Sequence, residues 1–166
     1  MEFGGCPPNS TSDPFFTHYR QTILPSLAIT ITSDHILQNF ESLPVRLSNT
    51  AMAHLVQPKP GSEWCSPAGN CGLFIFQKSG AAFQLLLYAP VTKKLHILIN
   101  SINGYHDIQT DGDGGGGYFG ISIYQFDGKV YRLSSCFSKI YGLTVDSHGE
   151  IEVSNNPRVS RIACPA

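Results

Sequence analysis

Two aspartates placed two residues apart, Asp111 and Asp113, are the residues of this sequence best suited to binding a cation. They belong to the run Asp-Gly-Asp-Gly-Gly-Gly-Gly over residues 111–117. Calcium binds carboxylate and carbonyl oxygens, but the run lacks the distal bidentate glutamate of an EF-hand. It precedes an expected strand rather than a helix, which also disfavours a phosphate site. We therefore expect a flexible loop tip, no metal and no cofactor, with Asp111 and Asp113 as weak metal candidates.

Cys71 is the candidate nucleophile, and His106 is a candidate base for it. A nucleophilic cysteine needs a base within reach and a local field that lowers its pKa. The run from Asn70 to Leu73 resembles the Asp-Cys-Ser-Gly-Leu run of NlpC/P60 peptidases, with one residue missing. The residues after Cys71 favour a strand instead of a helix N-terminus. A cysteine hydrolase using Cys71 is therefore an alternative function, and the first expectation is that the chain is not an enzyme.

The cysteines suggest disulfides rather than a metal site. None of the five forms a C-x-x-C pair, so zinc-ribbon and thioredoxin-type sites have no support. Pro and Gly between Cys65 and Cys71 are compatible with a local disulfide, and Cys136 and Cys164 form the second candidate pair. Buried free thiols are the alternative. If both disulfides form, the protein matures outside the cytoplasm, and we expect a periplasmic or secreted location.

Aromatic and acidic side chains near the expected turns are the candidates for binding a partner. Loop aromatics can form a binding face for proteins or sugars, and they can equally cover the end of a small sandwich. We expect a protein or glycan partner. The candidate binding residues are Trp64, Tyr105, Asp111, Asp113, Tyr118 and Phe119.

Composition excludes several classes of partner. The chain has 166 residues, 14% charged residues and a formal net charge of −1, without a basic cluster. Binding to a phosphate backbone requires several Lys or Arg on one surface, so we expect no nucleic acid partner. No apolar run reaches the length of a membrane helix, so we expect no membrane span. Met1-Glu2-Phe3 leaves no room for the charged and apolar parts of a secretory leader. A chain that begins just after a removed leader would look the same, so we expect export with the leader absent from this chain. The oligomeric state stays open.

The pattern from residue 42 onward is that of short strands separated by turns rich in Gly, Pro, Asn and Asp. We expect a flexible tail over 1–14, short helices over 15–24 and 33–40, and a strand over 27–32. Residues 15–166 then form a single domain. The expected strands of its β part are 43–47, 52–57, 72–78, 82–89, 94–100, 105–110, 118–126, 130–138, 141–146 and 149–154.

An internal repeat is the most informative feature. Residues 72–87 align without a gap on residues 120–135, and the turns Ser79-Gly80 and Asp127-Gly128 coincide. Each repeat predicts a meander that cannot bury its apolar face alone. The second repeat of the same chain can cover that face. We therefore predict a mostly β fold with two tandem antiparallel meander units packed as a sandwich or open half-barrel. The units cover about 42–90 and 94–138, and a C-terminal hairpin covers 141–154.

Residues 40–166 resemble uncharacterised bacterial exported proteins related to FG-GAP-type repeats. The resemblance rests on residues 64–71 with 73–76, on 103–108 and on 124–131. In that group the segment matching Arg46 to Leu55 usually reads as a calcium-type loop, whereas here its carboxylates are absent. The resemblance implies export and a β fold, and it implies no activity.

These observations give three hypotheses for the function. The first is a non-catalytic extracytoplasmic binding or accessory domain that binds a macromolecule through its loop end. The second is the hydrolase that uses Cys71. The third is a protein inhibitor or immunity-type protein that blocks an enzyme with a loop such as residues 110–118.

Overall fold

A computed structural model describes residues 38–59, 61–62, 64–80, 82–145, 147–148, 151–153 and 156–165. The expected tail over 1–14, the helix over 15–24 and the strand over 27–32 lie outside the described residues. Of the helix expected over 33–40, residues 38 and 39 are helical, but Phe40 already begins a strand. That end of the prediction was wrong because Phe40 pairs with Pro58 in the first sheet.

The first sheet is a four-stranded antiparallel meander in the order β1-β2-β3-β4. Its side chains alternate between two faces, as in any β-sheet. Both faces of β3 are apolar, and its residues 73–76 are all buried. The strands are β1 (Phe40–Arg46), β2 (Met52–Pro58), β3 (Cys71–Ser79) and β4 (Ala82–Thr92).

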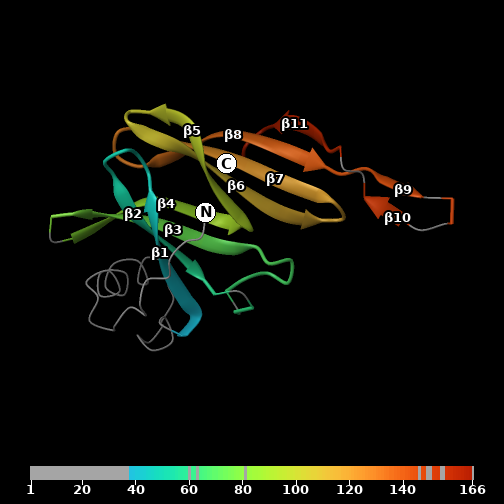
Figure 1. The fold of residues 1–166 in the computed structure, drawn as a ribbon, viewed down its shortest axis with the longest axis horizontal. Coiled ribbons are helices and arrows are strands. Elements are labelled where there is room, and N and C mark those ends of the chain that lie inside the picture. Colours follow the sequence, from blue (N-terminus) through green and yellow to red (C-terminus); the bar gives the residue numbers. More distant parts are fainter. Residues whose placement is uncertain are drawn as a thin grey trace.

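The second sheet has five antiparallel strands in the order β11-β8-β7-β6-β5. Four of them form a second consecutive meander, and β11 is added beside β8. The hairpin of β9 (Leu143–Val145) and β10 (Ile151–Val153) projects away from both sheets (Figure 1). The strands of the sheet are β5 (Lys94–Ile102), β6 (Tyr105–Gly115), β7 (Tyr118–Phe126), β8 (Tyr131–Ile140) and β11 (Arg158–Ile162).

The two sheets pack face to face and are not closed into a barrel, which confirms the predicted mostly β sandwich (Figure 1). The core lies between them, where Leu73 and Ile75 of β3 meet Ile108 of β6 and Tyr124 of β7. Because the sheets join through one residue, Lys93, between β4 and β5, their edges also meet there. The Lys93 amide donates to the Asp111 carbonyl at 2.7 Å. This junction positions the site described below.

The hairpin turns identified from the repeat occupy equivalent places in the two meanders. β3–β4 and β7–β8 are the third and fourth strands of their units. Gly80 and Gly128 have φ values of 62° and 101°, the left-handed region that glycine reaches without steric cost. The duplication itself stays a prediction. β11 was not expected from the sequence, since the strands predicted there ended at residue 154.

The Asp127 turn gives a prediction about acid stability. Asp127 Oδ1 accepts the amides of Lys129 and Val130 at 2.8 and 2.9 Å, and Oδ2 accepts from Arg132 Nε at 3.0 Å. The two amides and the guanidinium lower the pKa of Asp127 from 3.8 to about 2. Because the folded pKa is depressed, this stabilisation is present above pH 3.8 and is lost as the pH falls towards 2.

Asp127→Ala should therefore lower the urea midpoint at pH 6 and have much less effect at pH 2. Asp127→Asn is the matched control, because its amide oxygen can still accept the two turn amides. It should lie between wild type and Asp127→Ala at pH 6. An equal loss for Asp127→Ala at both pH values would contradict this account of the turn.

Candidate functional site

Asn70 fastens the disulfide loop to β6 at the junction of the two sheets. Its Nδ2 donates to the Asp113 carbonyl at 2.7 Å, and its Oδ1 accepts the Asp113 amide at 2.6 Å. Lys93 Nζ forms an ion pair with Asp113 Oδ2, also at 2.6 Å. The loop that carries Trp64 and Cys65 is thereby held beside Asp111 and Asp113.

Most of the glycine-rich run is β-strand, so the expectation of a loop tip over residues 111–117 was wrong for residues 111–115. Residues 111–115 continue β6 and pair with β7. Gly115, Gly116 and Gly117 all have positive φ, and they turn the chain into β7. A Cβ on Gly114 would clash with the Tyr118 ring, so that ring packs directly on the backbone.

The outer face of the five-stranded sheet carries an apolar patch at its centre. Tyr124 and Phe126 of β7 point into the core, so the alternate residues of β7 point outward. Phe137 lies opposite Ile121 on β8, which places it on the same outer face. We define the outer patch as Phe119, Ile121, Ile123 and Phe137. All four side chains are half-buried.

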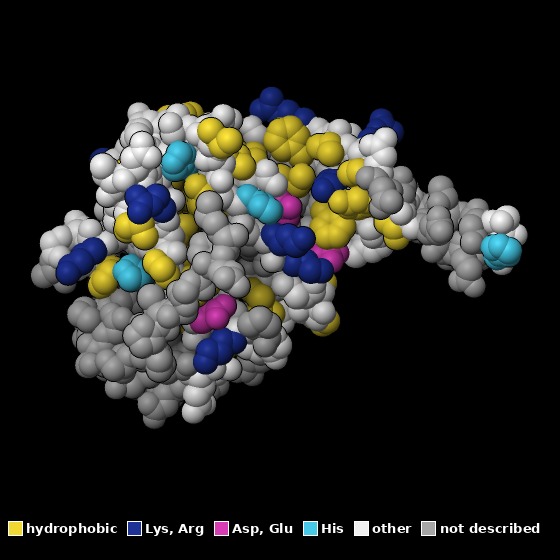
Figure 2. All heavy atoms as spheres, in the orientation of Figure 1, with side chains coloured by type: hydrophobic (Ala, Val, Ile, Leu, Met, Phe, Trp, Pro, Cys, Tyr) yellow, Lys and Arg dark blue, Asp and Glu magenta, His cyan; other side chains and the backbone are white. Residues whose placement is uncertain are grey.

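Polar and charged residues border the outer patch on both sides. On β6, Asp113 lies opposite Phe119, Asp111 opposite Ile121, and Gln109 opposite Ile123. Figure 2 shows hydrophobic side chains gathered over β7 and β8, with acidic, basic and histidine side chains beside them. The basic side is formed by Lys139 of β8, opposite Phe119, and Arg161 of β11, opposite Phe137.

The acidic side is held in place by hydrogen bonds. Asp111 Oδ1 accepts from Gln109 Nε2 at 2.7 Å, and His96 Nε2 lies 3.6 Å from Asp111 Oδ2. The hydrogen bond from Lys93, followed by that from the Gly115 amide, holds the pKa of Asp113 below its usual value. Both carboxyl groups are therefore presented in fixed orientations next to the outer patch.

The carboxyl groups of Asp111 and Asp113 are already engaged by protein donors. Lys93 and the Gly115 amide take the two oxygens of Asp113, while Gln109 and His96 adjoin Asp111. Among the described residues, no group of three or more His, Cys, Asp or Glu side chains is placed to hold a metal ion. The arrangement of these two aspartates is that of a polar border.

Aromatic contacts extend the outer patch towards the turn after β8. The rings of Phe119 and Tyr141 meet edge to face at 5.7 Å, and Lys139 Nζ lies 5.1 Å from the Tyr141 ring centroid. The Tyr141 amide donates to the Gly117 carbonyl at 2.9 Å, which fixes this segment beside the β6–β7 turn. Tyr118, which is 38% exposed, lies at the same end of the sheet.

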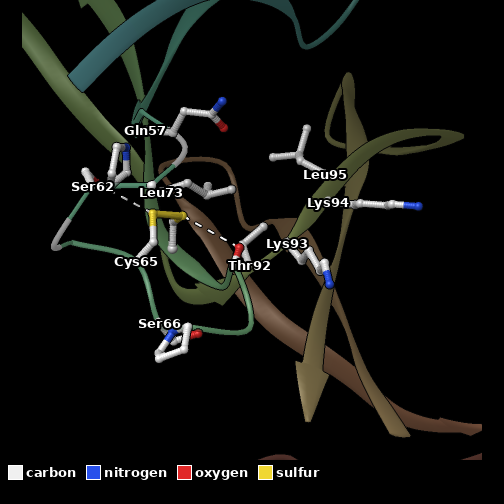
Figure 3. A pocket seen from close by; sticks show the side chains of 14 residues that line it. Gln57, Ser62, Cys65, Ser66, Leu73, Thr92, Lys93, Lys94 and Leu95 are labelled. Atoms are coloured by element: carbon white, nitrogen blue, oxygen red, sulfur yellow. Dashed lines mark hydrogen bonds between the residues drawn. A yellow bond between two sulfur atoms is a disulfide. The ribbon is translucent and has the colours of Figure 1, made fainter. Parts of the chain in front are cut away.

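A pocket of about 420 Å³ lies between the disulfide loop and the β4–β5 connection. Its volume is in the range of small-ligand sites, and its walls include Leu73, Leu95 and the Cys65–Cys71 disulfide. Thr92 is buried there, and its Oγ1 has no hydrogen-bond partner. Figure 3 shows Lys94 pointing away from this space and marks the Ser62–Cys65 contact with a dashed line.

Both predicted disulfides are present, Cys65–Cys71 and Cys136–Cys164. The Cys71 sulfur is therefore no free thiolate. The proposed base is also misplaced, because Asn70 contacts Asp113 whereas His106 lies seven residues earlier on β6, a rise of roughly 20 Å. The His106 amide instead donates to the Leu47 carbonyl at the far end of the sandwich. The pairing of Cys71 with His106 was wrong for these two reasons.

The predicted binding residues do not form one loop cluster. Tyr105 stacks on Phe126 at 4.1 Å and donates to Gln77 Oε1 at 3.0 Å, so it packs against the core at the opposite end from Tyr118. Trp64 contacts Phe40 at 5.7 Å between ring centroids. Tyr118, Phe119, Asp111 and Asp113 do lie together at one end of the five-stranded sheet.

Sequence reasoning missed three members of the outer patch, namely Ile121, Ile123 and Phe137. The available signal was that β7 is apolar at both odd and even positions, which means that both faces of this strand carry apolar side chains.

Comparison with protein-family models, curated proteins and solved structures found no match to the chain. Within the described ranges, no helix is long and apolar enough to cross a membrane.

Asn70→Ala should destabilise the protein by about 1–3 kcal/mol, because it leaves the Asp113 amide and carbonyl without their side-chain partner. Chemical denaturation would measure this loss, with the exposed Asn100→Ala as the control. Equal stabilities for the two variants would show that Asn70 does not fasten the disulfide loop.

Proposed function

We propose that this protein is a non-catalytic extracytoplasmic binding domain that recognises a protein partner through the outer patch. The observation that carries the proposal is the apolar centre of the outer face, half-exposed and bordered by ordered charges. Protein interfaces combine an apolar centre with a polar rim in the same way. A stable partner would bury the four patch residues and meet charges of both signs at the border.

A protein partner fits this surface better than a glycan. Sugars stack on flat aromatic rings, but the middle of the outer patch consists of Ile121 and Ile123, flanked by Phe119 and Phe137. The β-branched residues present a ridged aliphatic surface that suits the side chains of another protein. The border residues Asp111 and Lys139 then favour a partner whose own charges alternate across the contact.

The two disulfides support an extracytoplasmic location. Disulfides persist in oxidising compartments such as the periplasm and the extracellular space, and both pairs here are intramolecular. A periplasmic or secreted site of action is part of the proposal. The resemblance to exported FG-GAP-type proteins agrees with it and stays a prediction.

The alternative functions receive less support. The hydrolase hypothesis required a Cys71 thiolate, and its sulfur is bonded to Cys65. The inhibitor hypothesis relied on a loop over residues 110–118, most of which is β-strand. An inhibitor or immunity protein that uses the outer patch would be a particular case of the proposed binding domain.

Ile121→Asp tests the proposal by placing a charge in the middle of the outer patch. It should weaken partner binding by about 2 kcal/mol or more, roughly thirtyfold in Kd, as expected for a central interface residue. Ile99→Asp is the matched control, because Ile99 is 95% exposed on β5 outside the patch. It should change Kd less than about twofold, since surface changes outside an interface have small effects.

The purified domain would first be screened against extracellular proteins and against a glycan array, and Kd would then be measured by surface plasmon resonance. Protein binding that is lost in Ile121→Asp and kept in Ile99→Asp supports the proposal. Equal binding by the two variants, or binding to glycans alone, contradicts it.

A further inference from the structure

The four-stranded sheet has a second apolar face, directed away from the core. Val56 lies opposite Phe74 in the register of β2 and β3, next to the core pair Leu55 and Ile75, so Val56 and Phe74 point to the other side. Large apolar side chains of all four strands share that side. We define the aromatic face as Phe40, Val56, Phe74, Phe76 and Phe83.

The aromatic face is buried to an extent that a bare sheet face does not reach. Val56 and Phe76 are 0% exposed, and Phe40, Phe74 and Phe83 are no more than 9% exposed. The outer patch of the five-stranded sheet is the internal comparison, because its apolar residues stand on a similar sheet and are half-buried. The aromatic face therefore has a cover that the outer patch lacks.

The second sheet does not supply this cover. It packs on the opposite side, where Leu55, Leu73 and Ile75 form the core (Figure 1). Within the aromatic face, Phe74 lies 6.3 Å from Phe76 between ring centroids, so neighbouring rings shield one another at their edges. Among the described loops, Trp64 contacts this face at Phe40, which is one margin of it.

We propose that the segment over residues 15–37 binds the aromatic face and completes the fold as a third layer. This segment leads directly into β1, and Phe40, the first residue of β1, is itself part of the aromatic face. Its sequence contains apolar residues throughout, including Phe15, Phe16 and the alternating run from Leu27 to Thr32. A segment tethered at the margin of the face binds at a high effective concentration.

The proposal names a different surface from the outer patch and does not depend on the proposed function. A second copy of the chain and a separate protein are the competing occupants. They are distinguished by isotope-filtered NOE measurements on the full chain, in a sample that mixes uniformly labelled and unlabelled protein.

NOEs between residues 15–37 and the rings of Phe74 and Phe76 within one labelled chain are the expected result. NOEs that join labelled to unlabelled chains would overturn the proposal in favour of a second copy. If neither kind is present, these residues do not cover the face and the proposal fails.

Two variants give an independent test on the full chain. Ile29 and Thr30 are neighbours in the alternating run, and the proposal requires Ile29, on the apolar side of that pattern, to contact the face while Thr30 does not. Ile29→Asp should raise hydroxyl-radical labelling of Phe76 roughly tenfold, as expected if local opening exposes a buried group. Thr30→Asp should leave labelling near the wild-type level. Equal labelling in the two variants would contradict binding through the apolar side of the run.

Discussion

Phe76→Ala should lower the free energy of unfolding by about 3–5 kcal/mol, the range for truncating a fully buried phenylalanine. Phe76 is 0% exposed although it points away from the core between the sheets. The loss combines the removed apolar burial with the cavity that the ring leaves behind. Equilibrium denaturation in urea at neutral pH measures it.

Phe137→Ala is the matched control for this prediction. Phe137 lies on the outer face of the other sheet and is half-buried, so its truncation removes less burial and leaves no enclosed cavity. We expect a loss of about 1 kcal/mol on the area scale. If the two variants lose the same stability, the aromatic face is no better covered than the outer patch.

Replacing Cys136 and Cys164 together with alanine should cost about 3.5 kcal/mol. The disulfide joins β8 to the segment after β11 and closes a loop with a sequence separation of 28. A disulfide lowers the conformational entropy of the unfolded chain, and this effect grows with the length of the closed loop. A loop of this size stabilises the folded protein by about 3.5 kcal/mol. The change removes the covalent link between Cys164 and β8, whereas the pairing of Arg161 with Phe137 in the sheet remains.

The Cys65→Ala, Cys71→Ala double variant should cost less, about 2 kcal/mol, because its sequence separation is 6. Urea denaturation of both double variants, each keeping the other disulfide, tests the order. A larger loss for the short loop would mean that native contacts of the disulfide loop, such as that of Asn70, outweigh the restriction of the unfolded chain.

The sequence predicted most strands because alternation and turn residues are local signals. The strands β2 to β5, β7 and β8 were predicted near their observed bounds, and Gly80 and Gly128 marked two of the turns. Pairing of Cys65 with Cys71 was also predictable, because the two cysteines enclose a short Pro- and Gly-containing loop.

The remaining features depend on contacts between distant parts of the chain. Residues 111–115 look flexible by composition, but Asn70 binds Asp113 from 43 positions away and β7 pairs alongside. Tyr105 was a candidate binding residue that could equally cover the end of the sandwich, and its stacking on Phe126 places it against the core. β11 is short and carries two arginines, so its pattern alone does not identify it as a strand added to β8.

The same limit applies to the candidate site. Asp111, Asp113, Tyr118 and Phe119 were predicted because acidic and aromatic residues stand out near a turn. Their shared position follows from the pairing of β6 with β7, which brings Asp113 opposite Phe119. The patch also needs Phe137 from β8, and only the register of β7 with β8 identifies it.

The central claim is that the outer patch binds a protein, and site-specific photo-cross-linking tests it most directly. A benzoylphenylalanine would replace Ile121 in the outer patch or, as the control, Ile99 on β5. Each protein would be irradiated with the extracellular proteins of its source. We predict that position 121 cross-links to one protein other than itself and that position 99 does not. Equal cross-linking at both positions, or none at position 121, would contradict the claim.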